Sequence, residues 1–137
     1  MTTPNKQAIT TFLDALGAGD PDRMATVLAP GMEACAKGTG SFSMTRSREQ
    51  VLEGAGMLSA VLPGGIAFTV LTLTEEGDRV VAEVEGKAAT ADGTRYDNGY
   101  AFVATMQDGL IARLDEYYCT LLTENVLVPV AAGLAAQ

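Results

Sequence analysis

The stretch from Tyr96 to Cys119 constrains the fold more than any other part of the chain, because it has the pattern of a β-hairpin. Two runs with alternating apolar residues flank Gln107-Asp108-Gly109, and an Asp-Gly pair between such runs is a strong hairpin signal. Successive side chains of a strand point to opposite faces. On the second strand one face is apolar until its last residues: Leu110, Ala112, Leu114, Glu116 and Tyr118. The other face consists of Ile111, Arg113, Asp115, Tyr117 and Cys119, and its charges predict contact with solvent.

The first strand of this hairpin adds more polar groups to an apolar surface. Its residues Tyr96, Asn98, Tyr100 and Phe102 share one face. A buried polar group costs free energy unless it is hydrogen-bonded, so a carboxylate, an amide and several phenols on inward faces mark a candidate binding site. We take Glu116, Asn98 and Tyr100 as its candidate catalytic residues.

Two interpretations of these residues stay open. Glu116 is either a base whose pKa is raised by desolvation, or a structural carboxylate bonded to Asn98 or to a tyrosine. Asn98 either orients a ligand or satisfies Glu116, and the two roles are compatible. For the individual tyrosines, core packing with a hydrogen-bonded hydroxyl is the alternative to catalysis.

Charge and composition narrow the partners. The formal net charge of −8 and the pI of about 4.3 argue against nucleic acid and against an anionic membrane surface, since both require clustered Lys and Arg. The chain has no histidine, which removes the commonest general base and the commonest metal ligand. We therefore expect neither a metal nor another cofactor.

The two cysteines, Cys35 and Cys119, are far apart and lack the spacing of a metal site. They fit free thiols of a reduced cytoplasmic protein. The first residues lack a signal-peptide pattern. The apolar tail, with Pro129 inside it, is too short to span a bilayer.

Three helices are predicted in the first half of the chain, over residues 4–17, 21–28 and 47–61. Thr3-Pro4 is a good helix start, and Ser47 with Gln50 three residues later resembles a capping box. Short strands are expected over residues 32–37 and 41–45.

Strands dominate the second half of the chain. A strand from Ile66 to Thr74 has apolar residues on both faces, which is typical of a sheet covered on both sides. A strand from Arg79 to Ala89 leads into the hairpin, and its residues Glu83 and Glu85 are expected in solvent. Strands linked by such short turns are antiparallel, and helices on one face of that sheet make an α+β domain. We expect a single domain over residues 1–137.

Three segments resemble a known superfamily: FLDALGAGDPDRMATVLAP, GDRVVAEVEGKAATADG and YDNGYAFVATMQDGLIARLDEYYCT. They are similar to the SnoaL-like branch of the nuclear-transport-factor-2-like, ketosteroid-isomerase-like fold, over nearly the whole chain. The resemblance implies a cone, in which a strongly curved antiparallel sheet is wrapped by three N-terminal helices around an apolar pocket. The residues expected to line that pocket are Phe12, Leu16, Met24, Leu58, Phe68, Tyr96 and Tyr118, with Tyr100.

Members of the superfamily include steroid isomerases, polyketide cyclases, epoxide hydrolases, dehydratases and domains without known catalysis. Phe12 stands where ketosteroid isomerases have a tyrosine, and no Asp stands near Ala34, where they have the general base. Polyketide cyclases pair an Asp with His, and this chain has no His. Glu116-Tyr117 resembles the Asp-Tyr pair of limonene-epoxide-hydrolase-like proteins, but the neighbouring strand has no central Arg.

Two functions follow from the resemblance and the polar cluster. The first is a cofactor-independent isomerase, cyclase or hydrolase that acts on a small apolar molecule with acid/base chemistry from Glu116. The second is a non-catalytic ligand-binding or assembly domain of the same fold. Both are expected as homodimers, since one face of the strand from Ile66 and the tail over residues 126–137 need a partner to cover them.

Overall fold

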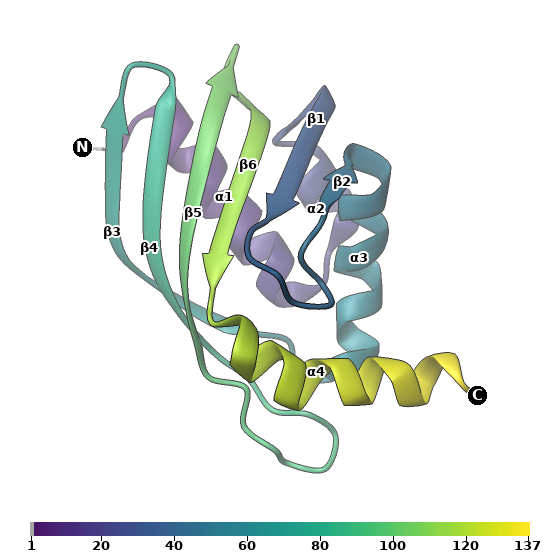
Figure 1. Ribbon diagram of the computed structural model, residues 1–137. Helices are drawn as coiled ribbons and strands as arrows, with labels where there is room; N and C mark the ends of the chain where they lie inside the picture. The colour runs from purple at the N-terminus through teal and green to yellow at the C-terminus, as the bar shows by residue number, and fades with distance from the viewer. Residues whose placement is uncertain (1) are drawn as a thin grey trace.

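The computed structural model describes residues 2–137, which form helices packed on one face of a six-stranded sheet (Figure 1). The elements in chain order are α1 (Pro4–Ala18), α2 (Pro21–Ala25), β1 (Leu28–Ala36), β2 (Thr45–Ser47), α3 (Arg48–Val61), β3 (Ala67–Glu76), β4 (Arg79–Lys87), β5 (Asn98–Gln107), β6 (Leu110–Tyr118) and α4 (Thr120–Ala135). The predicted α+β class and the three N-terminal helices are confirmed.

The sheet is mixed, with strand order β2-β1-β6-β5-β4-β3. The strands β3 to β6 pair antiparallel in sequence order, as predicted. The prediction of a wholly antiparallel sheet is wrong, because β1 runs parallel to β6. The sheet is also less curled than the predicted cone: β1 and β2 extend it sideways as a twisted layer beyond β6 (Figure 1).

Helix boundaries follow the predicted caps. The Thr3 side chain accepts a hydrogen bond from the Lys6 amide, and α1 ends at Gly19 in the left-handed conformation (φ 65°). The capping box of Ser47 and Gln50 at the start of α3 is present. The second helix ends earlier than predicted, at Ala25.

The first strand begins at Leu28, before the predicted residue 32. The short strand expected over residues 41–45 lies instead at Thr45–Ser47. The reason is a turn: the Ser43 hydroxyl accepts from the Gly40 amide and donates to the Lys37 carbonyl, which keeps these residues out of the sheet.

The C-terminal segment is a helix that the sequence analysis did not predict. α4 continues through Pro129 and buries Thr123 and Leu127. It crosses below the end of β6 and projects away from the sheet toward the C-terminus (Figure 1). Of the helices in the described residues, none has both the length and the apolar character that a membrane crossing needs.

Two β-bulges change which side chains face the helices. In β3 the pairing with β4 shifts between Val70 and Thr72, so Phe68, Val70 and Leu73 all pack toward the core although they differ in parity. Leu71, the extra residue, is 54% exposed. The prediction that β3 is covered on both faces is therefore wrong. Because a bulge inserts one extra residue, the core-facing residues before and after it have different parity, and the sequence resembles that of a strand with two apolar faces.

The second bulge lies in the hairpin, where the pairing of β5 and β6 shifts between Thr105 and Met106. It places Ile111 in the core, fully buried, instead of on the charged face to which its parity assigned it. Beyond the bulge, parity holds: Leu114 is buried, Glu116 and Tyr118 are half-buried, and Tyr117 is exposed. The expected solvent exposure of Glu83 and Glu85 is confirmed.

The main core lies between the inner face of the sheet and helices α1 and α2. Its largest fully buried side chains include Phe12, Phe102, Ile9, Leu13, Met24 and Met32, each contributing about 1.5–3 kcal/mol by removal from water. α1 approaches β3 closely at Gly17, whose carbonyl accepts from the Ile66 amide. A Cβ at Gly17 would lie 2.4 Å from the Ile66 carbonyl oxygen, so only glycine fits.

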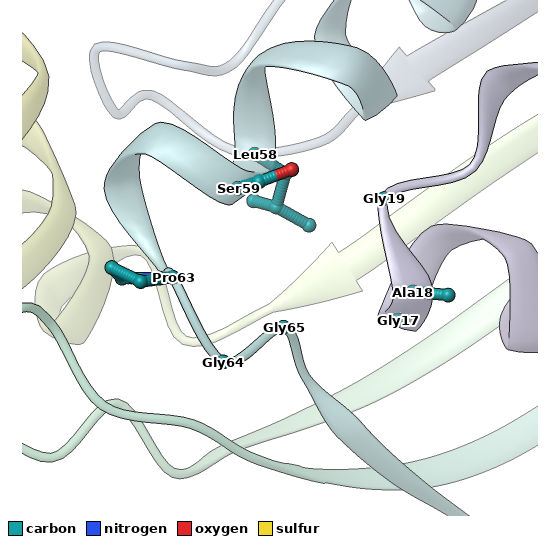
Figure 2. Close-up of a pocket in the computed structure, with 8 residues that line it drawn as sticks. All are labelled: Gly17, Ala18, Gly19, Leu58, Ser59, Pro63, Gly64 and Gly65. Carbon is teal, nitrogen blue, oxygen red and sulfur yellow. The ribbon is translucent and has the colours of Figure 1, made fainter.

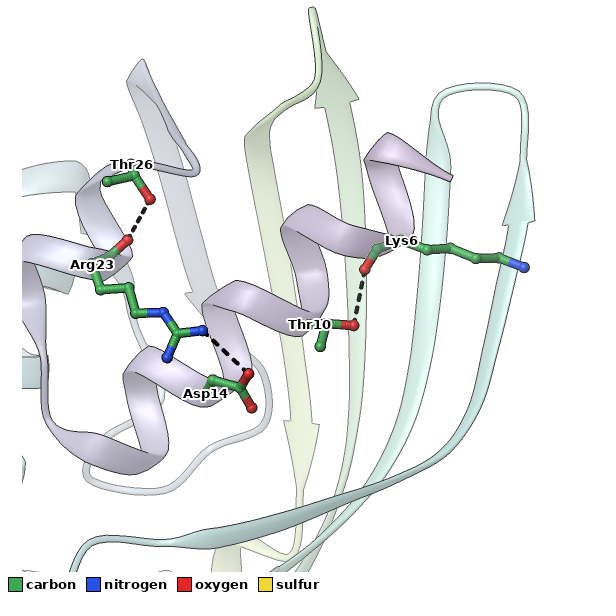
Figure 3. A network of polar contacts seen from close by, with 5 residues as sticks. All are labelled: Lys6, Thr10, Asp14, Arg23 and Thr26. Atoms are coloured by element: carbon green, nitrogen blue, oxygen red, sulfur yellow. Dashed lines mark hydrogen bonds and ion pairs between the residues drawn. The ribbon is translucent and has the colours of Figure 1, made fainter. Parts of the chain in front are cut away.

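The opposite side of α1 and α2 is polar. Arg23 pairs with Asp14 at 3.4 Å, Thr10 donates to the Lys6 carbonyl, and Thr26 donates to the Arg23 carbonyl (Figure 3). The Arg23–Asp14 pair is solvent-exposed and therefore contributes little stability. These contacts lie on the outer surface of the helical layer, away from the inner face of the sheet.

Candidate functional site

The sheet register brings the predicted polar residues together on its inner face. Residues that pair in adjacent strands point to the same face. Glu116 pairs with Phe102 on one side and Ala36 on the other. In the next rows Tyr118 pairs with Tyr100, and Asn98 pairs with Gly86. These side chains come from the ends of β5 and β6 that lie nearest α4.

Glu116 is a half-buried carboxylate without a protein partner. Within residues 2–137 its carboxylate accepts no hydrogen bond and forms no ion pair. Desolvation raises the pKa of Glu116 to about 7, although the charge of Arg46 acts in the opposite direction. Among the described residues, Arg48 Nε is the one side-chain polar atom that is fully buried and has no hydrogen-bond partner, so the unpaired oxygens of Glu116 are not fully buried. The Glu116 oxygens are therefore unpaired yet still reached by solvent.

The two tyrosines beside Glu116 are shifted as well. Burial raises the pKa of Tyr118 to about 12, and the nearby Glu116 adds to that rise. Burial also raises the pKa of Tyr100, and the neighbouring Tyr96 reinforces it. The rings of Tyr100 and Tyr118 lie 6.1 Å apart, and Tyr100 stacks on Phe102 at 5.5 Å. Both phenols stay protonated at neutral pH and can donate hydrogen bonds.

Asn98 has a structural role, and its predicted bond to Glu116 is wrong. Its amide donates to the Tyr96 hydroxyl (3.1 Å) and to the Cys119 carbonyl (3.2 Å), and its oxygen accepts from the amides of Gly99 and Cys119. Both amide hydrogens are used, because the β5 and β6 strand ends meet at Asn98. Asn98 therefore fastens the start of β5 to the end of β6.

Tyr96 continues this network into α4. Its buried hydroxyl lies 2.7 Å from Thr123 Oγ1, and Thr123 donates in turn to the Cys119 carbonyl. Thr123 was missed because α4 was not predicted. We call Tyr96, Asn98, Cys119 and Thr123 the α4 clasp.

Arg46 is the other residue that sequence reasoning missed. It lies on β2 opposite Ala34, and its charge acts on both Glu116 and Tyr118. The signal that could have found it is the capping box: Ser47 fixes the start of α3, so a strand that leads into this helix includes Arg46.

The residues expected to line a single pocket divide between two clusters. Phe12 and Met24 are fully buried in the main core, with Leu16, Phe68 and Tyr100 packed against it. Leu58 and Tyr96 belong to a second cluster around Leu62 and Leu127, beneath α4. Tyr118 is half-buried between the two groups.

Two surface hollows lie away from this polar group. One, of about 130 Å³, lies between the end of α1 and the end of α3, lined by Gly17, Ser59 and Pro63 among others (Figure 2). Another, of about 490 Å³, lies beside the chain from Lys87 to Ala91. Neither is lined by Glu116, and their walls are largely backbone and small side chains. Within residues 2–137, no three acidic or cysteine side chains group closely enough to hold a metal ion.

The comparison with known proteins agrees with this geometry. The family model of the SnoaL-like domain matches residues 9–114. No curated protein matches the chain. Among solved structures, a candidate SnoaL-like polyketide cyclase from Jannaschia sp. CCS1 superposes with a TM-score of 0.75 at 18% identity, over 90% of this chain and 91% of that one.

Two further structures show the same fold. TerC, co-crystallised with polyporic acid, has a TM-score of 0.78 at 22% identity and covers 92% of this chain and 99% of its own. A protein with a ketosteroid-isomerase-like fold from Catenulispora acidiphila DSM 44928, in complex with trimethylamine, has a TM-score of 0.75 at 18% identity, over 91% and 95% of the two chains. The family match and the shared architecture establish that the chain belongs to the SnoaL-like family, within the nuclear-transport-factor-2-like, ketosteroid-isomerase-like fold.

Proposed function

We propose that the chain is a cofactor-independent acid/base catalyst that moves a proton on a small apolar substrate, with Glu116 as the base. The observation that carries this proposal is the state of the Glu116 carboxylate: inward-facing, unpaired, still reached by solvent, and with its pKa raised to about 7. A base with a pKa near the working pH combines a deprotonated population with a strong drive to accept a proton.

The substrate would lie over the inner face of the sheet beside Glu116. The rings of Tyr100 and Tyr118 would contact its apolar part, and their hydroxyls would donate to an oxygen that gains negative charge. That arrangement suits removal of a proton next to a carbonyl group, which forms an enolate. The products would be an isomer or a cyclised compound, and candidate cyclase function is also named for the Jannaschia relative.

Epoxide opening is less well supported. A hydrolase that opens an epoxide needs a second carboxylate beside Glu116 to share the proton transfers. Besides Glu116, Glu124 is the acidic residue whose charge acts on Tyr118. Its carboxylate accepts hydrogen bonds from the Ser41 backbone amide and from the Ser41 hydroxyl, the latter at 2.8 Å. Glu124 is therefore engaged in fastening α4 to the loop after β1.

The alternative is a ligand-binding or assembly domain without catalysis. It is favoured by Asn98, whose donors and acceptor are all engaged by Gly99 and by the other residues of the α4 clasp, so that none is left for a substrate. In that case the open carboxylate of Glu116 would only contact a ligand.

Substitution of Glu116 by Gln separates the two functions. The test follows conversion of cyclohex-3-en-1-one to its conjugated isomer, with deuterium uptake from D₂O recorded by NMR as the more sensitive signal. We expect catalysis by the native chain to rise with pH and level off above about 7, because the base acts when deprotonated. Glu116→Gln should reduce the rate by about 100-fold or more.

The matched control is Glu85→Gln, which removes an exposed carboxylate from the outer face of β4 and should leave the rate unchanged. Equal rates for the native chain and Glu116→Gln, or no deuterium uptake above buffer, would favour the non-catalytic alternative.

A further inference from the structure

Arg46 is a cation on the inner face of the sheet. β2 pairs with β1 so that Arg46 lies opposite Ala34, which is 5% exposed and belongs to the main core. Because paired residues point to the same face, the Arg46 side chain is directed toward the interior. It is half-buried, whereas its neighbour Thr45 is exposed.

Only short side chains separate Arg46 from Glu116. The strand between them contributes Ala34 and Ala36 to the inner face, and Ala36 pairs directly with Glu116. Alanine extends little above the sheet, so the long arginine side chain can pass over β1. The positive charge of Arg46 also acts on both Glu116 and Tyr118, in keeping with its position two strands away from Glu116 on the same face.

Arg46 has no partner in the described part of the chain: it forms no ion pair and no side-chain hydrogen bond. Most other arginines are engaged. Arg23, Arg95 and Arg113 pair with Asp14, Asp97 and Asp115, and Arg48 donates to the Ala25 carbonyl. The donors of the Arg46 guanidinium are therefore free for a ligand, and its nitrogens are still reached by solvent.

We infer that Arg46 binds the carboxylate of an anionic small molecule whose apolar body lies against Tyr100 and Tyr118. The planar fork of a guanidinium matches a carboxylate, which accepts two parallel hydrogen bonds from it. The rest of the protein disfavours an anion, since the net charge is −8, so an acid can bind only where a local cation offsets that field. The inference rests on the proposed function in one respect, the placement of the ligand beside Glu116.

A pair of isosteric probes tests this assignment without turnover. Binding of 2-naphthoate and of neutral 2-naphthamide is measured by isothermal titration calorimetry at pH 8, with the full chain. We expect the native chain to prefer the naphthoate, and Arg46→Gln to weaken naphthoate binding about tenfold or more while leaving the amide unchanged. Arg46→Lys should give an intermediate loss, because it keeps the charge but not the fork.

The control is Arg113→Gln on the outer face, where the guanidinium already pairs with Asp115. It removes the same charge from the molecule and should not alter the preference between the probes. In ¹⁵N-arginine spectra, naphthoate should shift the side-chain signal that Arg46→Gln deletes.

Several results would overturn the assignment: equal affinity of the native chain for both probes, no naphthoate binding at millimolar concentration, or equal losses for both probes in Arg46→Gln. Failure of the proposed function looks different. A chain that selects naphthoate through Arg46 but shows no deuterium uptake dependent on Glu116 binds an acid without catalysis. The reverse pattern leaves Glu116 as a base and rejects Arg46 as the anchor.

Discussion

Burial of the Glu116 carboxylate costs free energy in a way that depends on pH. Its pKa is about 7 in the folded chain and 4.5 as the ordinary value. Below pH 4.5 the group is protonated in both states and adds no penalty. Between pH 4.5 and 7 the unfolded chain releases this proton while the folded chain keeps it, so stability is lost over that window and the penalty is complete above pH 7. The full shift corresponds to about 3 kcal/mol.

Glu116→Gln removes this titration. The free energy of unfolding, measured with urea, should therefore be about 3 kcal/mol higher in the variant than in the native chain at pH 8.5, with little difference at pH 4.5. Glu85→Gln serves as the reference for an exposed carboxylate. If the two substitutions change stability equally at both pH values, the Glu116 carboxylate is not desolvated.

For single residues, the sequence pattern predicted the inward orientation of Glu116 correctly, but it predicted the contacts of the neighbouring residues less well. Alternation along β6 predicts that Glu116 and Tyr118 face inward, and the register agrees above the bulge. The partner of Asn98 could not be predicted, because its hydrogen bonds depend on where β5 begins relative to the end of β6. Arg46 was missed because its strand has only three residues.

Helix α4 is held to the domain by a small part of its surface. Leu127, 7% exposed, packs in the second cluster with Leu62 and Tyr96, whereas Leu121 on the same helix is 69% exposed. Leu127→Ala should therefore destabilise the chain by about 2–3 kcal/mol, because it leaves a cavity as well as losing buried area.

Leu121→Ala is the matched substitution and should change stability by less than about 0.5 kcal/mol. Thermal unfolding of the two variants side by side checks this. Equal melting temperatures would show that α4 is detached from the second cluster in solution.

The elements themselves differ in how well they could be predicted. α1 and α3 were predicted well because their caps are local signals, Thr3-Pro4 and the Ser47 capping box. The bulges in β3 and β6 have no such signal: Leu71 and Ala112 are ordinary residues, and only pairing with the next strand reveals them. α4 was missed because Pro129 usually ends a helix.

For the molecule as a whole, we propose that two copies associate through the outer face of the sheet. One reason to predict a dimer from the sequence was an apolar outer face on β3, and the bulge in β3 removes that reason. The reason that remains is the centre of β4, β5 and β6, where Val81 pairs with Val103 and Ala101 pairs with Tyr117, which is 47% exposed. Val103→Glu places a charge at this centre and should convert a dimer to a monomer.

Light scattering at micromolar concentration is the measurement, with a native mass of twice the 14.2 kDa chain. Gln107→Glu adds the same charge at the exposed end of β5 and should leave the dimer intact. A native chain that is already monomeric would reject the proposal. At this scale caps, alternation and short turns predicted the helices and the four-strand meander, but not the parallel pairing of β1 with β6, which joins segments distant in sequence.

The bulge in β3 also affects how the molecule meets other molecules of its kind. β3 is an edge of the sheet, and an unpaired edge is a template for intermolecular strand addition and fibril growth. The shift between Val70 and Thr72 breaks the even spacing of free backbone groups along that edge. An incoming strand can align with the segment before the bulge or with the segment after it, but not with both. The bulge in β3, which made side-chain parity a poor guide to burial, therefore also limits aggregation at this unpaired edge.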